Sequence, residues 1–241
     1  MDTVKIAHGK TRMIAHRGLS GIERENTHAA FVAAGNRSYF GIETDVHRTA
    51  DGQFVIIHDE DTGRVSEGAV CMQVEQQSFA EMEQLRLPDR SGRIRRDLCL
   101  PTLEEYIRIC KQYDKVCVLE LKNAFTPEDI EAIVEICRRE QYLHQVIFIS
   151  FVLENCVCLR RLLPRQPIQW LLCREVDEAV IENLCRYRLE LDCYYPALNR
   201  QLIARLHDLG IQVNGWTCDD PAAAAELVDA GIDFITTNIL E

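Results

Sequence analysis

The chain has 241 residues, 47% of them hydrophobic, which is enough for a full core and within the usual size of one α/β barrel. It carries 27 Lys and Arg against 38 Asp and Glu, a formal net charge of −11 at pH 7. This charge argues against general affinity for nucleic acid or an anionic membrane surface, and we expect neither as a partner.

The cysteines and the lengths of the apolar runs indicate the cellular compartment of the protein and whether it enters a membrane. The eleven cysteines are odd in number and scattered, and no two are spaced as CxxC. We expect them to be reduced thiols of a cytoplasmic protein rather than disulfides or zinc ligands. No apolar run approaches the length of a membrane span, and residues 1–10 lack the apolar core of a signal peptide, so we expect no stable membrane insertion. A homo-oligomer is compatible with the sequence.

The N-terminal part is predicted to contain a strand and then a β-hairpin. Residues 12–16 form the strand, and residues 41–59 form the hairpin around Asp51-Gly52, which is typical of a two-residue turn. This turn would place Asp45 opposite His58, with Glu43 roughly 7 Å along the same face. Two carboxylates this close repel each other in a dry site unless a cation lies between them. An alternative interpretation is an edge strand whose polar residues, including these two carboxylates, lie in water.

Two further expectations concern the hairpin and the segment that follows it. We expect His47 to lie off the face of Glu43 and Asp45 and to face solvent. Residues 60–100 contain few large apolar residues and read as an insertion, a small lid or subdomain.

From Pro101 onward, helices and strands alternate regularly to residue 237. This alternation predicts a parallel sheet with right-handed crossovers, and eight β/α units fit a closed TIM barrel better than an open sheet. We therefore expect one domain, residues 1–241, with the insertion at 60–100 after the second barrel unit. The expected barrel strands are 12–16, 41–46, 116–121, 146–151, 168–173, 191–195, 211–216 and 234–237.

Polar residues recur at the C-terminal ends of these strands, where barrels of this kind build their active sites. Three carboxylates supply hard oxygen ligands, which favours Mg²⁺ or Ca²⁺ as the cofactor. Two basic side chains beside the metal would hold a phosphate group, and two histidines would transfer protons to and from oxygen. The pattern indicates metal-assisted cleavage of a phosphoester. The candidate residues are Glu43, Asp45 and Glu120 for the metal, Arg17 and Lys122 for the phosphate, His16 and His58 for proton transfer, and Trp216 as an apolar wall for the substrate.

These residues lie within motifs that closely resemble the glycerophosphodiester phosphodiesterase family, over nearly the whole chain and in the family's order. The motifs are His16-Arg17-Gly18, Glu25-Asn26-Thr27, Gly41-Ile42-Glu43-Thr44-Asp45-Val46, Asp51-Gly52 with His58-Asp59, Pro101-Thr102-Leu103, Glu120-Leu121-Lys122, Trp216-Thr217 and Thr236-Thr237-Asn238. The chain departs from the family's usual residues at Thr62, Val65, Ser66 and Ile239. None of the departures removes a candidate catalytic group.

The resemblance implies a TIM-barrel hydrolase of lipid and glycerol metabolism that splits small-molecule glycerophosphodiesters into sn-glycerol 3-phosphate and an alcohol with a divalent cation. The nucleophile would be a water or the glycerol 2-hydroxyl, and either histidine would be the acid or the base. The family's metal-binding carboxylates fall on Glu43, Asp45 and Glu120. Its catalytic histidines fall on His16 and His58, and its phosphate-contacting residues fall on Arg17 and Lys122.

Two other functions compete with this one. A relative of the lysophospholipase D or sphingomyelinase D type would use the same metal site on an acyl-bearing substrate. It would need an exposed apolar rim or an interfacial helix, for which the sequence offers no candidate. A non-catalytic barrel that binds phosphodiesters would be expected to have lost a histidine or a metal carboxylate, and none is lost.

Overall fold

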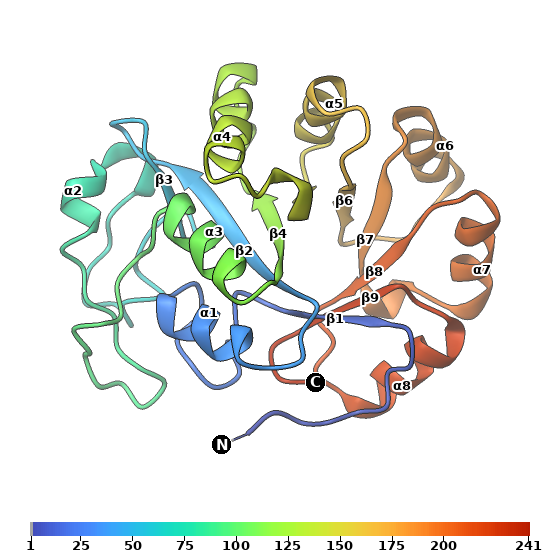
Figure 1. Ribbon diagram of the computed structural model, residues 1–241, viewed down its shortest axis with the longest axis horizontal. Coiled ribbons are helices and arrows are strands. Elements are labelled where there is room, and N and C mark those ends of the chain that lie inside the picture. The colour runs from blue at the N-terminus through green and yellow to red at the C-terminus, as the bar shows by residue number, and fades with distance from the viewer. Residues whose placement is uncertain (1) are drawn as a thin grey trace.

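The computed structural model describes residues 2–241, in which eight parallel strands close into a barrel surrounded by helices (Figure 1). The ring runs β1-β9-β8-β7-β6-β5-β4-β2 and closes where β2 pairs with β1. A further strand, β3 (Phe54–Ile56), pairs antiparallel with β2. The predicted TIM barrel is confirmed. Its strands are β1 (Arg12–Ala15), β2 (Gly41–Arg48), β4 (Val116–Leu121), β5 (Val146–Ser150), β6 (Ile168–Leu172), β7 (Glu190–Tyr194), β8 (Val213–Trp216) and β9 (Phe234–Thr237).

Most of the α-helices begin at side chains that satisfy free backbone N–H groups, whereas α5 begins at Val152 without such a cap. At α3, Thr102 and Glu105 form a reciprocal capping box, and at α4 the Thr126 cap precedes a proline in the first turn. The α-helices are α1 (His28–Gly35), α2 (Phe79–Met82), α3 (Leu103–Gln112), α4 (Pro127–Arg139), α5 (Leu153–Leu162), α6 (Glu178–Tyr187), α7 (Arg200–Asp208) and α8 (Pro221–Ala230). Three short 3₁₀ helices are η1 (Val74–Gln76), η2 (Leu143–Gln145) and η3 (Tyr195–Ala197).

Apolar side chains fill the space between the strands and the outer helices, and a smaller cluster fills the inside of the barrel. The inner cluster closes the barrel below the polar strand ends, so the site stands on a packed floor. Its buried members are Ile14, Val118, Ile147, Ile149, Leu171 and Phe234.

The hairpin has a different register from the expected one. Val46 pairs with Ile56, which leaves a three-residue loop at 50–52 whose last residue is a glycine with φ of 80°. A two-residue turn was expected, so the predicted pairing of Asp45 with His58 is wrong by one residue. The positive φ allows a longer loop of the type in which a left-handed residue follows a type I turn.

Residues 60–100 pack beside the N-terminal half of the barrel, where Figure 1 shows α2 on the outside of β3. They have their own apolar cluster, built from Val65, Met82 and Leu87 among others, which joins the barrel through Val55 and Ile57. The segment also reaches the first barrel loop, because Arg90 donates a hydrogen bond to the carbonyl oxygen of Ser20.

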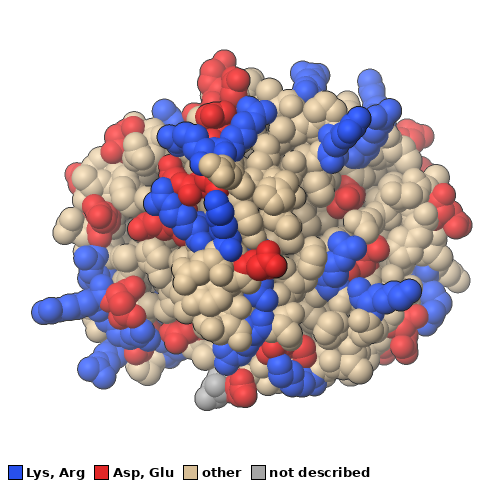
Figure 2. Space-filling model, viewed as in Figure 1, with Lys and Arg blue, Asp and Glu red and all other residues tan. Residues whose placement is uncertain are grey.

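Charged side chains of both signs are interspersed on the face that Figure 2 shows, with uncharged surface between them. Within residues 2–241, no helix has the length and apolar character needed to cross a bilayer. All eleven cysteines are free thiols.

Candidate active site

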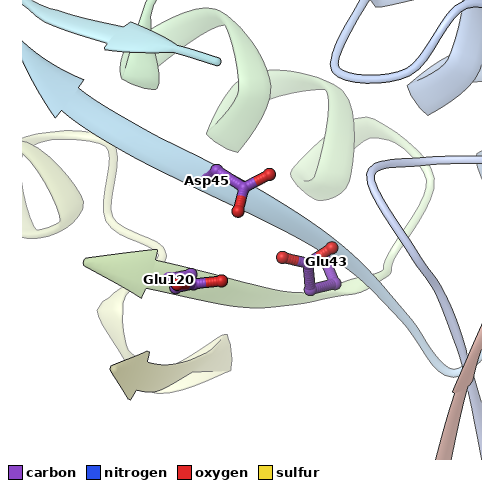
Figure 3. A group of neighbouring side chains, drawn as sticks. All are labelled: Glu43, Asp45 and Glu120. Atoms are coloured by element: carbon purple, nitrogen blue, oxygen red, sulfur yellow. The ribbon is translucent and has the colours of Figure 1, made fainter. Parts of the chain in front are cut away.

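Three carboxylates from β2 and β4 converge inside the barrel (Figure 3). Glu43 and Asp45 lie two residues apart on β2, and Glu120 lies on β4 in register with Asp45. Each offers an oxygen, and these three atoms lie within 4.8 Å of one another. All three residues are buried. The structure therefore brings together all three residues that the sequence proposes as metal ligands.

The electrostatics of this group fit a divalent cation. Burial, with the charge of Asp45 added, raises the pKa of Glu43 well above its usual value and that of Glu120 to about 8. Burial also acts to raise the pKa of Asp45, but the charges of Arg17 and Lys122 outweigh it and hold that pKa low. Asp45 Oδ1 is buried and accepts no hydrogen bond. A buried set of hard oxygen donors with a free lone pair is what Mg²⁺ or Ca²⁺ takes as ligands.

Two cations border the carboxylates. The Arg17 Nε lies 3.4 Å from Asp45 Oδ2, and the Lys122 Nζ lies 2.9 Å from Glu120 Oε1 and 3.6 Å from Asp45 Oδ1. Arg17 Nε is buried and donates no hydrogen bond. Arg17 lines the cavity between the strand ends, and Lys122 contacts the Glu120 carboxylate that lines it. Both cations thus lie beside the carboxylates with capacity to bind a further anion, which suits a phosphodiester there.

His16 follows β1 and has a fixed orientation. Its Nδ1 lies 2.7 Å from Asn238 Oδ1, and the amide nitrogen of Asn238 donates to Asp219. Asn238 Oδ1 is therefore an acceptor, so Nδ1 of His16 carries the proton and Nε2 has a free lone pair. Nε2 lies 4.0 Å from Glu43 Oε2. Burial, with the charge of Arg17, lowers the pKa of His16 to about 4, so the ring is neutral near pH 7.

His58 reaches the same cavity from the loop after β3, although it does not pair with Asp45. Its Nδ1 donates to Asp59 Oδ1 at 2.6 Å, which leaves Nε2 free and stabilises a positive charge on the ring. Burial, with the charge of Arg17, lowers the pKa of His58, while Asp45 opposes that shift. His58 is thus held by a carboxylate, whereas His16 is held by a neutral amide.

His47 is buried, and the expectation that it faces solvent is wrong. It lies on β2 on the side of Glu43 and Asp45, because alternate residues of a strand share a side and the strand continues to Arg48. Its Nε2 lies 3.1 Å from the carbonyl oxygen of His58. His47 therefore holds the main chain of His58 in place.

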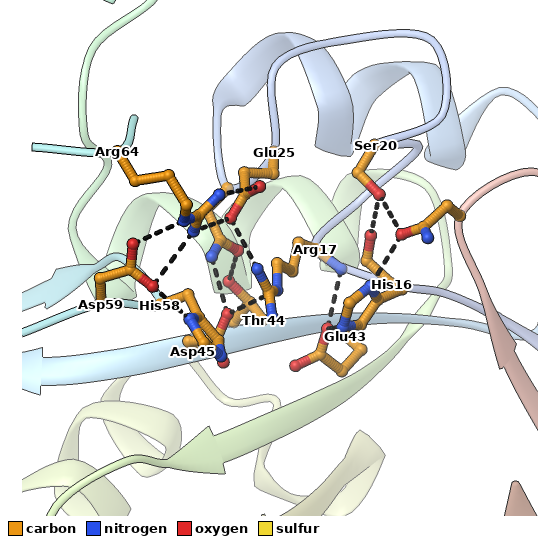
Figure 4. A network of polar contacts seen from close by, with 12 residues as sticks. His16, Arg17, Ser20, Glu25, Glu43, Thr44, Asp45, His58, Asp59 and Arg64 are labelled. Carbon is orange, nitrogen blue, oxygen red and sulfur yellow. Dashed lines mark hydrogen bonds and ion pairs between the residues drawn. The ribbon is translucent and has the colours of Figure 1, made fainter. Parts of the chain in front are cut away.

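A network of ion pairs connects Arg17 with the carboxylate that holds His58 (Figure 4). Glu25 accepts from Arg17 at 2.8 Å and from both terminal nitrogens of Arg64 at 2.8 Å. Arg64 also contacts the Asp59 carboxylate, which holds His58. Burial acts to raise the pKa of Glu25, but the hydrogen bonds of Arg64 and the charge of Arg17 outweigh it and lower that pKa to about 2.

The sequence motifs include Glu25, Asp59 and Asn238, but they assign no role to these residues or to Arg64. Asp59 directly follows His58, and Asn238 closes the last strand motif, so chain position was an available signal for both. Arg64 offered no such signal, and its partner Glu25 is 39 positions away in the sequence.

Trp216, at the end of β8, lines the same cavity as His16, His58 and the Glu43 and Glu120 carboxylates. This cavity measures about 50 Å³. The structure therefore groups Trp216 with the other candidate residues.

The comparisons with known proteins agree with this geometry. The model of the glycerophosphoryl diester phosphodiesterase family matches residues 16–241. A glycerophosphodiester phosphodiesterase of Caldanaerobacter subterraneus subsp. tengcongensis is 28% identical over 231 residues, which cover 95% of this chain and 94% of the relative. A glycerophosphodiester phosphodiesterase of Bacillus subtilis is 26% identical over 244 residues, covering 93% and 82%.

Solved structures show the same similarity. An Oleispira antarctica phosphodiesterase in complex with the product sn-glycerol-3-phosphate superimposes with a TM-score of 0.85 at 27% identity, covering 94% of this chain and 92% of that one. A glycerophosphodiester phosphodiesterase from Parabacteroides distasonis gives a TM-score of 0.78 at 29% identity, covering 96% and 94%. The chain therefore belongs to the glycerophosphoryl diester phosphodiesterase family, as its sequence motifs predict.

Proposed function

We propose that the protein hydrolyses glycerophosphodiesters to sn-glycerol 3-phosphate and an alcohol. The observation that carries the proposal is one cavity lined by the buried Glu43 and Glu120 carboxylates, by Arg17 and by two histidines with free Nε2 atoms. Asp45 and Lys122 contact these lining residues directly. Family membership supports it, as does the product bound in the Oleispira antarctica relative.

A divalent cation, Mg²⁺ or Ca²⁺, fits the Glu43, Asp45 and Glu120 oxygens. It would neutralise buried carboxylates, of which Glu43 and Glu120 have pKa values raised by burial and by the charge of Asp45. When bound, the cation would supply Lewis-acid polarisation of a phosphoryl oxygen. Arg17 and Lys122 bind the phosphate from the side and stabilise negative charge that develops on its oxygens. Glu25 and Asp45 hold Arg17 in place for this task.

The two histidines have different roles in the proposed reaction. His16 is neutral, with its lone pair on Nε2, so it takes the proton from the attacking oxygen as general base. Burial lowers the pKa of His58, but the Asp59 carboxylate opposes that shift and favours the protonated ring. His58 is therefore assigned as the residue that gives a proton to the departing alcohol oxygen from Nε2. After the reaction, the two rings exchange their protons with solvent.

The location and the physiological role are part of the proposal. Eleven free thiols, many of them buried, are typical of a protein in a reducing compartment, which supports the cytoplasm. Glycerophosphodiesters are the deacylated forms of phospholipids, so the reaction would return their glycerol phosphate to lipid and glycerol metabolism.

An acyl-bearing substrate is a second candidate, and one structural feature favours it. Phe151 and Tyr194 pack on Trp216 with ring centroids 5.5 and 6.0 Å apart, yet they are 41% and 43% exposed. This exposed aromatic rim at the mouth of the barrel could contact the apolar part of a lysophospholipid.

The test is release of glycerol 3-phosphate from glycerophosphocholine and glycerophosphoethanolamine by the purified protein with Mg²⁺, with Ca²⁺ and with EDTA. We expect release that EDTA abolishes and that the Glu120→Gln variant lacks, while Glu135→Gln, an exposed residue of α4, retains it. His16→Ala and His58→Ala should each lower the rate by about 10² to 10⁴. Release of choline from lysophosphatidylcholine alone would favour the second candidate, and no hydrolysis of any substrate would contradict both.

A further inference from the structure

Asp192 is a buried carboxyl group in the cavity that the proposed chemistry does not use. It lies on β7, paired with Leu171 of β6 and Asn214 of β8, and only 1% of it is exposed. Its Oδ1 is buried and accepts no hydrogen bond from any described residue. Burial, with the charge of Glu120, raises its pKa well above the usual value. Such a group is costly to the fold unless it acquires a partner.

Trp216 presents the complementary group at the same place. It lies on β8, and its indole Nε1 is buried and donates no hydrogen bond within residues 2–241. A buried indole N–H normally finds an acceptor. Asp192 and Trp216 both line the 50 Å³ cavity, together with Glu43 and Glu120. Apart from Arg17 and the candidate metal ligands, the described residues of the cavity wall thus present a free acceptor on Asp192 and a free donor on Trp216.

The neighbouring polar residues of the barrel interior differ from these two, because they satisfy one another. The amide nitrogen of Asn214 donates to Gln169 at 3.3 Å and to Thr236 at 3.2 Å. The amide nitrogen of Gln169 donates to Glu190 at 3.1 Å. This network needs no ligand. Asn214 also lies near enough to Asp192 to oppose the rise in its pKa. Even so, Asp192 Oδ1 and Trp216 Nε1 have no hydrogen-bond partner in this network.

A hydroxyl group matches this pair, since it donates one hydrogen bond and accepts another. The cavity has room for roughly three to five water-sized groups, which suits a short polyol chain rather than a large headgroup. A larger hollow of about 430 Å³, lined by Ser20, Glu25 and Asp219 among others, shares His16 and Arg17 with it. The phosphate would lie at the shared residues, the glycerol in the small cavity and the alcohol in the large hollow.

The position of β7 in the barrel indicates which hydroxyl is recognised. In the closed ring of eight strands, β7 stands opposite β2, the strand of Glu43 and Asp45. A substrate whose phosphate lies near β2 reaches toward β7 with the atoms farthest from phosphorus. In a glycerol phosphodiester that group is the terminal hydroxyl.

We propose that Asp192 and Trp216 form the glycerol subsite, in which Asp192 Oδ1 accepts a hydrogen bond from the terminal hydroxyl of glycerol and the indole Nε1 donates one to its oxygen. The inference rests on the proposed function and adds a specificity determinant to it. The buried Asp192 rejects substrates that lack the hydroxyl, because its oxygen would then remain without a partner.

The test compares two substrates with the same leaving group: glycerol 4-nitrophenyl phosphate and 2-hydroxypropyl 4-nitrophenyl phosphate, which lacks only the terminal hydroxyl. The readout is the ratio of their kcat/KM values. We expect the wild-type protein to have a higher kcat/KM for the glycerol ester than for the 2-hydroxypropyl ester. The ratio of the first value to the second should fall at least about tenfold in both Asp192→Leu and Trp216→Phe. Asp192→Asn keeps an acceptor oxygen and should retain most of the ratio, as should the exposed control Asp208→Leu on α7.

Folding is checked separately by circular dichroism and thermal unfolding. An apolar residue in place of a buried unpartnered carboxyl should not lower Tm, so Asp192→Leu is expected to fold. Trp216→Phe tests the donor independently. If the wild-type protein cleaves the glycerol ester and the variants Asp192→Leu and Trp216→Phe keep the wild-type ratio of kcat/KM values, the glycerol subsite is overturned and the proposed function stands. A wild-type protein that cleaves neither ester in the presence of metal overturns the proposed function as well.

Discussion

The Nδ1 of His16 donates to Asn238 Oδ1 at 2.7 Å, and this contact determines that Nε2 is the nitrogen that faces the Glu43 carboxylate. Ser20 donates to the same oxygen at 2.6 Å, so the amide cannot turn without losing two hydrogen bonds. The free lone pair of His16, which we propose acts as the base, is therefore set by a residue 222 positions away in the chain.

Substitution of Asn238 should change both the rate and the pH dependence. Asn238→Ala removes the acceptor and should lower kcat about tenfold to a hundredfold, because the other tautomer of His16 becomes accessible. Asn238→Asp supplies a carboxylate that stabilises protonated His16 and raises its pKa. The acidic limb of the kcat/KM profile should then move to higher pH. An unchanged limb in Asn238→Asp would contradict the assignment of His16 as the base.

Asp59→Asn should change the basic limb of the kcat/KM profile. The variant removes the carboxylate that holds the His58 Nδ1 proton, so the pKa of His58 should fall further. The basic limb of the kcat/KM profile should therefore move to lower pH, while the acidic limb stays in place. A shift of the acidic limb instead would reverse the roles given to the two histidines.

The metal should stabilise the protein more as the pH rises. In the folded protein without metal, the pKa values of Glu43 and Glu120 are raised, the latter to about 8, whereas both groups ionise near 4.5 in the unfolded chain. Their contribution to the free energy of unfolding is thus full below about pH 4.5 and is lost as pH rises toward 8. A bound cation replaces the protons. Thermal unfolding with and without Mg²⁺ should show the larger rise in Tm at about pH 8 and the smaller at about pH 5.

Glu25 should matter for both stability and rate. Its pKa of about 2 lies below the usual 4.5, so its contribution to stability is present above pH 4.5 and is lost as pH falls toward 2. Glu25→Gln should lower Tm near pH 7 and lower kcat/KM about tenfold, since Arg17 loses a charged partner. The matched control is Glu23→Gln, whose partner is Arg95 at 3.3 Å, and it should change neither. Equal effects in both variants would remove the special role of Glu25.

The strand pattern and the ordered motifs were enough to predict the barrel and the residues grouped at its mouth. The eight predicted segments coincide with β1, β2 and β4 to β9 within a few residues. The hairpin register was not predictable from Asp51-Gly52 alone, because the same pair fits a two-residue turn and a three-residue loop.

Asp192 shows why the rest of the site could not be predicted. In a parallel barrel both faces of a strand are buried, so a single polar residue in β7 carries no signal of the side to which it points. The contacts of Arg64 with Glu25 and Asp59 were hidden for another reason. They depend on how residues 60–100 fold back on the barrel, and that segment has no regular period.

The most direct test of the account is a ³¹P NMR time course of glycerophosphocholine with the wild-type protein and Mg²⁺. We predict that the phosphodiester signal is replaced by that of glycerol 3-phosphate, that EDTA stops the conversion, and that excess Mg²⁺ restores it. A diester signal that persists unchanged with folded protein and metal, or a conversion that continues at the same rate in EDTA, would contradict metal-dependent hydrolysis at Glu43, Asp45 and Glu120.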